Sequence, residues 1–270
     1  MYKRILTGLS LGIVMISALL VHEISAIALL LIIAMFSSIE WRKSFLIPKK
    51  KRNVFLIMCA LILITGITLA FAKTEDFLRN LNLVLCILCL LQICYYSYTL
   101  ITNKSPKLFA SILSGLLYII LPTISCIYFL LENFNTNKWF ILSFIITNWS
   151  NDSMAYFGGK TYGKTPLAPT ISPKKTIEGS ITGLVFGILA LLACNLYFQF
   201  ELSTLHIVIL GIALIIAGAL GDLFESSLKR LVEIKDSGKL LPGHGGFLDR
   251  FDSFYFVLPV GILFIYLIQH

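Results

Sequence analysis

The chain has 270 residues, of which 57% are hydrophobic and 13% are charged, and its formal net charge is +8. Its mean hydropathy is +0.88. Since an average soluble domain is roughly 45–50% apolar and about 25% charged, this composition excludes an ordinary soluble domain and indicates a membrane protein.

Nine apolar runs follow one another along the chain, and most approach the roughly 20 residues that a membrane-spanning helix needs. They lie near residues 5–21, 24–39, 54–72, 82–101, 109–131, 139–157, 179–199, 205–220 and 252–268. The first run lacks a convincing cleavage site and a second follows directly, so we expect it to be retained. The predicted fold is an all-α polytopic membrane protein with about nine transmembrane helices.

The basic residues predict the orientation of these helices. With the N-terminus in the cytoplasm and alternating spans, 19 of the 22 Lys and Arg residues fall inside, and Lys73, Arg79 and Lys138 fall outside. This asymmetry favours an N-in, C-out topology. It also accounts for the net charge, because a basic cytoplasmic face lies beside anionic lipid headgroups. No module that interleaves aromatic and basic residues accompanies the charge, so we expect no nucleic-acid binding.

The two parts of the chain differ in polarity. Residues 1–140 carry almost no ionisable group within a span and form the N-terminal and middle transmembrane helices. Residues 141–270 contain two long segments rich in Gly, Pro, Lys and Asp, near 158–178 and 221–251. Because long loops in compact proteins tend to be functional, we expect a catalytic region here with a polar pocket that faces the cytoplasm.

The stretch from Gly158 to Thr165, GGKTYGKT, matches the phosphate-binding P-loop pattern. A working P-loop follows a β-strand and opens a helix. Here an apolar run precedes the stretch, and Pro166, Pro169 and Pro173 follow it, which excludes the required helix. We therefore do not expect a P-loop.

Four carboxylates stand at matching places in the second half. Asp222 and Glu225 end the eighth run, Asp249 and Asp252 begin the ninth, and each pair shares one face of a helix. The 16 residues of the eighth run span about 24 Å, short of a hydrocarbon core of roughly 30 Å, so Asp222 should lie at the membrane edge. Carboxylates there are costly unless they are paired or coordinated, and they predict a site for a hard cation such as Mg²⁺.

Basic residues and a glycine turn lie between the two pairs. Lys229, Arg230, Lys235 and the PGHGG sequence would complete the equipment for phosphoryl transfer at the level of the lipid headgroups. The alternative is a loop whose acids simply neutralise its own Lys and Arg residues. Composition alone does not separate the two.

The sequence from Ser226 to Asp252 closely resembles the signature of the phosphatidate cytidylyltransferases, or CDP-diacylglycerol synthases. The matching residues are Ser226, Leu228-Lys229-Arg230, Lys235-Asp236 and His244-Gly245-Gly246-Phe247-Leu248-Asp249-Arg250-Phe251-Asp252. An earlier segment is also similar to that family, through Asp152-Ser153, Ala155-Tyr156, Leu167-Ala168-Pro169, Ser172-Pro173-Lys174-Lys175-Thr176 and Glu178-Gly179. The resemblance covers roughly residues 148–253.

The resemblance implies transfer of CMP from CTP to phosphatidic acid, with release of pyrophosphate. It implies Mg²⁺ as the cofactor, with or without a second cation, a membrane lipid environment, a homodimer, and a place in a bacterial-type inner (plasma) membrane. The implied catalytic residues are Asp222, Asp249, Lys229, Arg230 and His244, and the implied metal ligands are Asp222, Asp249 and Asp252. The implied substrate-binding residues are Lys174, Lys175, Asp152, Lys235, Asp236, Arg250 and Ser226, with Glu225 and Asp236 as weaker candidates for supporting the metal.

Two other functions remain open from the residues. A CTP-dependent lipid or polyprenol kinase would use a similar metal site but would give CDP and a phosphorylated alcohol. An anion transporter is the alternative without catalysis, and it should place its charges near the membrane midplane. The acids of this chain cluster instead at one membrane edge, which argues against transport.

Overall fold

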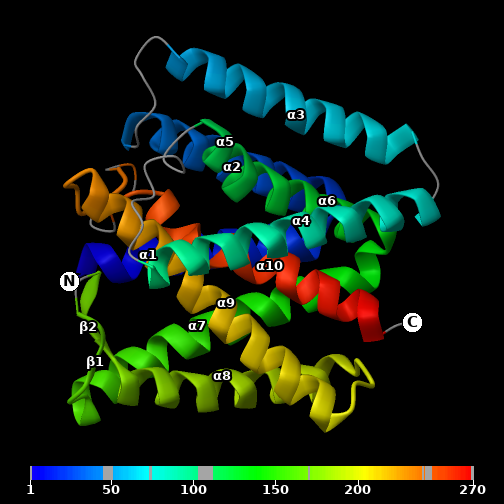
Figure 1. Ribbon diagram of the computed structural model, residues 1–270. Coiled ribbons are helices and arrows are strands. Elements are labelled where there is room, and N and C mark those ends of the chain that lie inside the picture. The colour runs from blue at the N-terminus through cyan, green and yellow to red at the C-terminus, as the bar shows by residue number, and fades with distance from the viewer. Residues whose placement is uncertain are drawn as a thin grey trace.

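The computed structural model describes residues 2–44, 51–72, 75–102, 112–169, 171–238, 240 and 245–268. Helices dominate these residues, and Figure 1 shows most of them running between the same two ends of the molecule. The first helices are α1 (Tyr2–Val21), α2 (Glu23–Ser44), α3 (Arg52–Ala72) and α4 (Glu75–Ile101). Then come α5 (Ile112–Gly115), a π-helical turn (Leu116–Ile120), α6 (Leu121–Glu132) and α7 (Phe134–Tyr162). Strands β1 (Pro166–Ala168) and β2 (Ser172–Thr176) precede α8 (Ile177–Phe198), α9 (Thr204–Leu231) and α10 (Leu248–Ile268).

The all-α polytopic membrane fold predicted from the sequence is confirmed. Six helical segments of the described chain are long and apolar enough to cross a membrane, and each of the nine predicted runs lies in or overlaps a helical segment. Two shorter apolar segments, Gly8–Val21 and Asn53–Thr68, lie in α1 and α3. The number of nine spans and the N-in, C-out topology stay predictions.

The core of the molecule is an aromatic cluster around Tyr118. Its buried ring packs against the rings of Phe224, Tyr255 and Phe256 at centroid distances of 5.2, 5.3 and 5.6 Å. These rings come from the π-helical turn, α9 and α10. Because apolar burial gives helices little reason to associate inside a membrane, such close packing is what holds them together.

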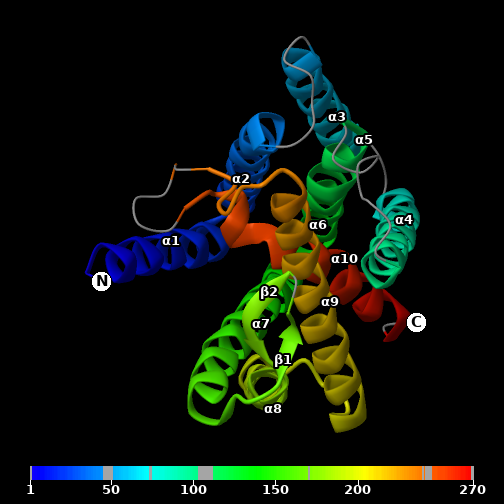
Figure 2. The same ribbon diagram turned by 60° about the vertical axis from the view of Figure 1, so that its left-hand side comes forward.

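Glycines bring α7 and α8 into close contact. A methyl group on Gly179 would lie 2.6 Å from the carbonyl oxygen of Ala155, and one on Gly183 would lie 2.6 Å from Oδ1 of Asn151. The spacing of Gly179, Gly183 and Gly187 predicts this kind of helix packing, and the prediction is confirmed. Figure 2 shows α8 lying beside α7 and α9, on the far side of the molecule from α3.

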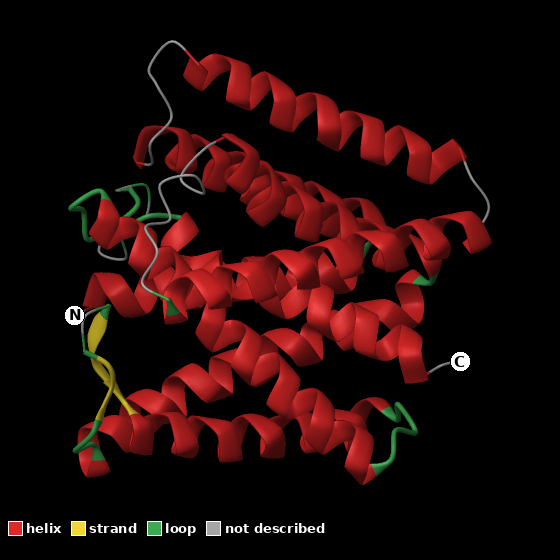
Figure 3. Ribbon diagram, viewed as in Figure 1, coloured by secondary structure: helices red, strands yellow, loops and turns green. Residues whose placement is uncertain are grey.

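The two predicted loops are shorter than expected. Helix α7 continues to Tyr162 and α9 to Leu231, while α10 begins at Leu248. The first loop also folds into the antiparallel β1–β2 hairpin, the strands drawn in Figure 3. The prolines of this segment exclude a helix, and Thr176 then caps α8 by accepting a hydrogen bond from the amide of Gly179 at 3.2 Å.

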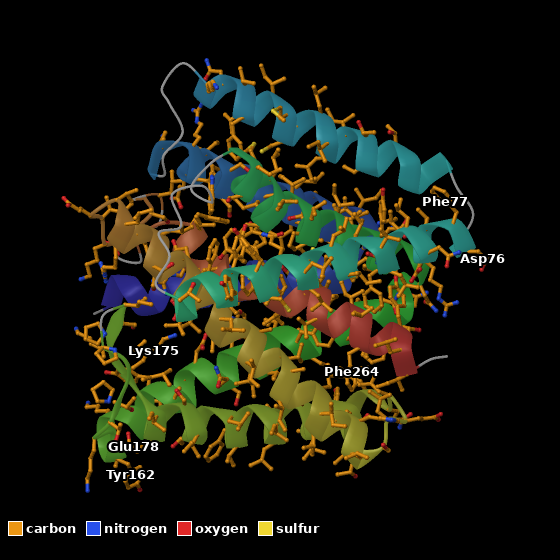
Figure 4. The ribbon with its side chains drawn as sticks, in the orientation of Figure 1. Asp76, Phe77, Tyr162, Lys175, Glu178 and Phe264 are labelled. Atoms are coloured by element: carbon orange, nitrogen blue, oxygen red, sulfur yellow. The ribbon has the colours of Figure 1, made fainter. Side chains whose placement is uncertain are left out.

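The β1–β2 hairpin and the described part of the segment between α9 and α10 lie at one end of the helix bundle, whereas the loop between α8 and α9 lies at the other end (Figure 3). In Figure 4, Lys175, Glu178 and Tyr162 lie at the hairpin end, whereas Asp76, Phe77 and Phe264 lie toward the opposite end. This separation agrees with the sequence-based assignment of the hairpin lysines to the inside and of Lys73 and Arg79, on either side of Asp76 in the sequence, to the outside. The functional site should therefore lie at the hairpin end.

Candidate active site

A cavity of about 570 Å³ opens at the hairpin end, between α7, β2, α9 and the start of α10. Nine of the thirteen predicted site residues line it: Asp152, Lys174, Lys175, Asp222, Lys229, Asp236, Asp249, Arg250 and Asp252. Segments separated by up to about 100 residues along the chain thus meet in one place. The predicted polar pocket exists, and it has room for a large part of a nucleotide or a lipid headgroup.

Helix α9 carries Asp222 into the cavity. The ammonium group of Lys175, from β2, forms an ion pair with Asp222, and Ser226 donates a hydrogen bond from Oγ to Asp222 Oδ1 at 3.3 Å. Ser226 does not line the cavity, and its hydroxyl contacts the site only by this hydrogen bond to Asp222. The hairpin is thereby joined to α9 directly beside the open volume.

The charge on Lys175 is stabilised by its surroundings. Burial alone lowers the pKa of Lys175, but the negative charges of Asp222 and Asp252 outweigh burial and raise it above the ordinary lysine value. Lys175 is therefore a permanent cation at neutral pH, which suits it to bind phosphate oxygens.

A fixed network holds Asp249 at the start of α10. Its carboxylate accepts hydrogen bonds from the amide of Ser237 at 3.0 Å, the amide of Gly246 at 2.8 Å and Nζ of Lys229 at 2.7 Å. Gly245 has a φ of 88°, a conformation that strongly favours glycine, and the Gly246 amide follows it. The two glycines Gly245 and Gly246 of the signature thus have a physical reason, because they turn a backbone amide toward Asp249.

Asp252 lies at a close contact between α9 and α10. A methyl group on Gly221 would lie 2.7 Å from the carbonyl oxygen of Asp252, and Tyr118 donates a hydrogen bond to that same oxygen at 2.9 Å. The side chain is buried, yet it still lines the cavity. The close approach brings Asp252 beside Asp222, as the matching spacing of the two carboxylate pairs predicts.

Glu225 and Lys229 lie one turn further along α9. Glu225 is fully buried, is absent from the cavity lining, and forms an ion pair with Lys229. Lys229 lines the cavity and reaches Asp249 as well. Of the two, only Lys229 is placed to meet a ligand, while Glu225 orients it.

Three further predicted residues lie apart from the cavity or outside the described chain. Arg230 is exposed, and its Nη1 donates to the carbonyl oxygen of Ile234 at 3.2 Å. It follows Lys229 directly, so it projects about 100° around the helix from the cavity face. Lys235 is exposed and does not line the cavity. His244 lies outside the described residues, so its role stays a prediction, as do those of Arg230 and Lys235.

The P-loop-like stretch is used differently from a P-loop. The carboxylate of Glu178 accepts hydrogen bonds from the amides of Lys164 and Thr165 at 3.1 and 3.2 Å. These are the amides that would face phosphates in a P-loop, and here an acidic side chain occupies them. Residues 158–162 of the stretch form the end of helix α7, and strand β1 follows the stretch, which is the reverse of the strand-then-helix order of a P-loop.

Sequence reasoning missed Glu40. This residue is in α2, within residues 1–140, where no site residue was predicted, and its buried carboxylate accepts a hydrogen bond from the amide of Leu248. The signal was an acidic residue at the end of an apolar run, which is costly in a membrane protein and therefore marks a function or a structural partner.

Comparison with known proteins decides the family. The model of the cytidylyltransferase family matches residues 2–268. The chain belongs to the cytidylyltransferase family.

Several relatives in this family carry the name phosphatidate cytidylyltransferase. The Bacillus subtilis (strain 168) protein is 43% identical over 137 residues, which are 50% of this chain and 51% of that protein. The Staphylococcus aureus (strain COL) protein is 47% identical over 143 residues, 52% of this chain and 54% of that protein. The Staphylococcus haemolyticus (strain JCSC1435) protein is 40% identical over 173 residues, 64% and 65% of the two chains. The chain thus matches between about half and two thirds of the length of these relatives.

The cavity of this family member offers the oxygen ligands that a hard cation prefers. Asp222, Asp249 and Asp252 all face it, but Lys175 and Lys229 hold the first two in ion pairs. Within the described ranges, no three acidic, His or Cys side chains are already grouped as metal ligands. These carboxylate oxygens fit a hard cation such as Mg²⁺ in kind.

Proposed function

We propose that this chain is a phosphatidate cytidylyltransferase of a bacterial inner (plasma) membrane. It would transfer CMP from CTP to phosphatidic acid and give CDP-diacylglycerol and pyrophosphate. The observation that carries the proposal is the cavity at the hairpin end, where the two signature segments of the resemblance bring lysines and aspartates together. The names of the relatives support the same substrates.

The charges in the cavity favour a divalent cation among the partners. Five basic residues and five aspartates line it, so its formal charge is balanced before any substrate enters. CTP and phosphatidic acid both bring negative charge that this balanced set does not neutralise. A cation held by Asp222, Asp249 and Asp252 would restore the balance and stabilise charge on the phosphate oxygens. A homodimer remains part of the proposal as an expectation from the family resemblance.

The proposed reaction needs no redox partner. An oxygen of the phosphatidate phosphate bonds to the α-phosphorus of CTP, and the bond from that phosphorus to the oxygen bridging to the β-phosphate breaks. The bonding electron pair leaves with pyrophosphate. Since the attacking oxygen is already anionic, no strong general base is required, and positioning and charge stabilisation supply the catalysis.

The described residues divide this work between two sides of the cavity. Lys174 and Lys175 on β2 and Lys229 on α9 line the cavity and would neutralise phosphate oxygens of the two substrates. Lys229 is fixed between Glu225 and Asp249, so its ammonium group is oriented before a substrate arrives. Preorganised charge of this kind is usually a large catalytic term.

The metal assignment is tested with the purified full chain, CTP, Mg²⁺ and phosphatidic acid. Asp222→Asn and Asp249→Asn should each lower kcat by about 100- to 1,000-fold, the loss expected when one preorganised electrostatic contact is removed. Asp76→Asn, at the opposite end of the molecule, is the matched control and should keep wild-type activity. Wild-type rates in the Asp222 and Asp249 variants would refute the assignment.

The product separates this function from the alternative kinase. A CTP-dependent lipid kinase would release CDP, whereas the proposed enzyme releases pyrophosphate. No feature of the described cavity favours the kinase, so it is kept as an outcome of the assay rather than as a second proposal.

A further inference from the structure

Glu40 lies near the end of α2, in a different part of the chain from the signature segments, and its side chain is only 3% exposed. Its Oε2 accepts a hydrogen bond from the amide of Leu248 at 2.8 Å and one from Oγ of Ser237 at 3.2 Å. These two residues lie on either side of the glycine turn. One buried carboxylate from the first half of the chain therefore holds residues on both sides of the glycine turn. We call the segment that joins α9 to α10 the signature loop.

The Glu40 carboxylate caps the first residue of helix α10, since it accepts the hydrogen bond of the Leu248 amide. The residue before Leu248 is Phe247, which has no polar atom to cap the helix. Free amides at a helix N-terminus need an acceptor, and a negative charge there is favourable. Glu40, from helix α2, supplies a carboxylate acceptor at the N-terminus of α10. Asp249 is the second residue of α10.

The loop is packed between Glu40 and Asp249. On one side, Glu40 holds Ser237 by its hydroxyl, and on the other side Asp249 holds the amides of Ser237 and Gly246. A displacement of Ser237 would therefore loosen Asp249 as well. The two carboxylates are coupled through shared loop residues, although only Asp249 lines the cavity.

The glycines of the loop fit this contact closely. A methyl group on Gly238 would lie 2.1 Å from Oε1 of Glu40, and one on Gly246 would lie 2.7 Å from Oε2. No side chain can be added at either place without moving the Glu40 carboxylate or the loop backbone. Gly238→Ala therefore disturbs the same contact from the loop side.

We infer that Glu40 is a positioning residue that fixes Asp249 in the cavity by holding the two ends of the signature loop and the first turn of α10. This role rests on the proposed function, in which Asp249 binds the catalytic cation. Glu40 itself touches neither substrate nor cation. Through Glu40, the first half of the chain would position a metal ligand in the second half.

Hydrogen exchange of the full chain, without metal or substrate, tests the inference independently of activity. Glu40→Ala should speed exchange at Leu248, which it contacts, and also at the amides of Ser237 and Gly246, which are held by Asp249. Ser37→Ala is the matched control, because it removes a 2.8 Å hydrogen bond between α2 and Tyr255 of α10 without touching the loop. It should leave the Ser237 and Gly246 amides protected.

Activity provides the second measurement. Glu40→Ala should raise the Mg²⁺ concentration for half-maximal activity by about 10- to 100-fold, as for other residues that support a metal ligand, with a smaller change in KM for CTP. Glu40→Gln keeps an oxygen acceptor for Leu248 and should recover part of the loss. Ser37→Ala should leave the Mg²⁺ dependence unchanged.

The outcomes separate the inference from the proposed function. Unchanged exchange at Ser237 and Gly246 in Glu40→Ala would overturn the positioning role, whatever the activity. If wild-type protein makes no CDP-diacylglycerol, the proposed function fails while the exchange result still stands. Where Glu40→Ala does not accumulate, Glu40→Gln and Gly238→Ala serve instead, and wild-type exchange and Mg²⁺ dependence in both would refute the inference.

Discussion

Lys229 joins two carboxylates with different surroundings. Glu225 is fully buried and does not line the cavity. Asp249 lines the cavity and also accepts hydrogen bonds from two backbone amides. A buried ion pair contributes little net stability, because both charges are removed from water. Removing one partner is costly, since it leaves the other charge buried without compensation. The Glu225–Lys229 pair is therefore best explained by the position that it imposes on the Lys229 ammonium group.

Lys229→Met tests this explanation through stability. The change leaves Glu225 without its cation and should lower the free energy of unfolding by about 3–5 kcal/mol. Arg230→Met, the next residue along and exposed, should change it by less than about 0.5 kcal/mol. Thermal unfolding of the purified variants in detergent measures both effects.

The double variant Lys229→Met/Glu225→Leu separates stability from activity. It should regain most of the stability, because an apolar pair of similar size replaces the ion pair. It should remain inactive, because Lys229 also faces the cavity. Full activity in this double variant would show that Lys229 has only a structural role.

At the scale of elements, helix α7 and helix α8 form the frame on which β2 presents its lysines. The close contact depends on Gly183, where a methyl group would lie 2.6 and 2.7 Å from side-chain and backbone oxygens of Asn151. At Gly187, a methyl group would instead lie 2.6 Å from Cδ1 of Ile215, the flexible end of a side chain. The two positions share a helix face but differ in how easily the neighbour can move.

Gly183→Ala should therefore lower stability more than Gly187→Ala. We expect a loss of about 1–3 kcal/mol for Gly183→Ala, the usual cost of overpacking against a neighbour that cannot shift, and less than about 1 kcal/mol for Gly187→Ala. Thermal inactivation of membranes that contain each variant provides the comparison. Equal losses of stability in the two variants would contradict the view that the contact of Gly183 with Asn151 limits how closely α7 and α8 can pack.

Local patterns in the sequence predicted the elements well. The apolar runs predicted the helices, and the three-residue spacing of Asp249 and Asp252 agrees with the cavity that both residues line. Of the other pair, Asp222 lines the cavity and Glu225 does not. The β1–β2 hairpin was not predicted, because proline excludes a helix without specifying which strands pair. The loop limits were also wrong, since α7 and α9 continue into polar sequence.

At the scale of the whole molecule, two residues of the first half of the chain, where no site residue was predicted, contact the site in the second half. Glu40 of α2 holds the signature loop, and Tyr118 of the π-helical turn donates to the carbonyl oxygen of Asp252. Both contacts link residues more than 100 positions apart along the chain. Spacing along one sequence cannot reveal such contacts, because they depend on how the helices cross. Nine of the thirteen predicted site residues, all within residues 141–270, line one cavity, whereas their contacts with residues 1–140 were not predicted.

The central claim is that CMP, and not the terminal phosphate of CTP, is transferred to phosphatidic acid. Two reactions with the purified full chain test it directly, one with CTP labelled at the α-phosphate and one with CTP labelled at the γ-phosphate. We predict that the α-label enters the lipid and the γ-label appears in pyrophosphate, and that both depend on phosphatidic acid and Mg²⁺. Entry of the γ-label into lipid, with release of CDP, would contradict the claim.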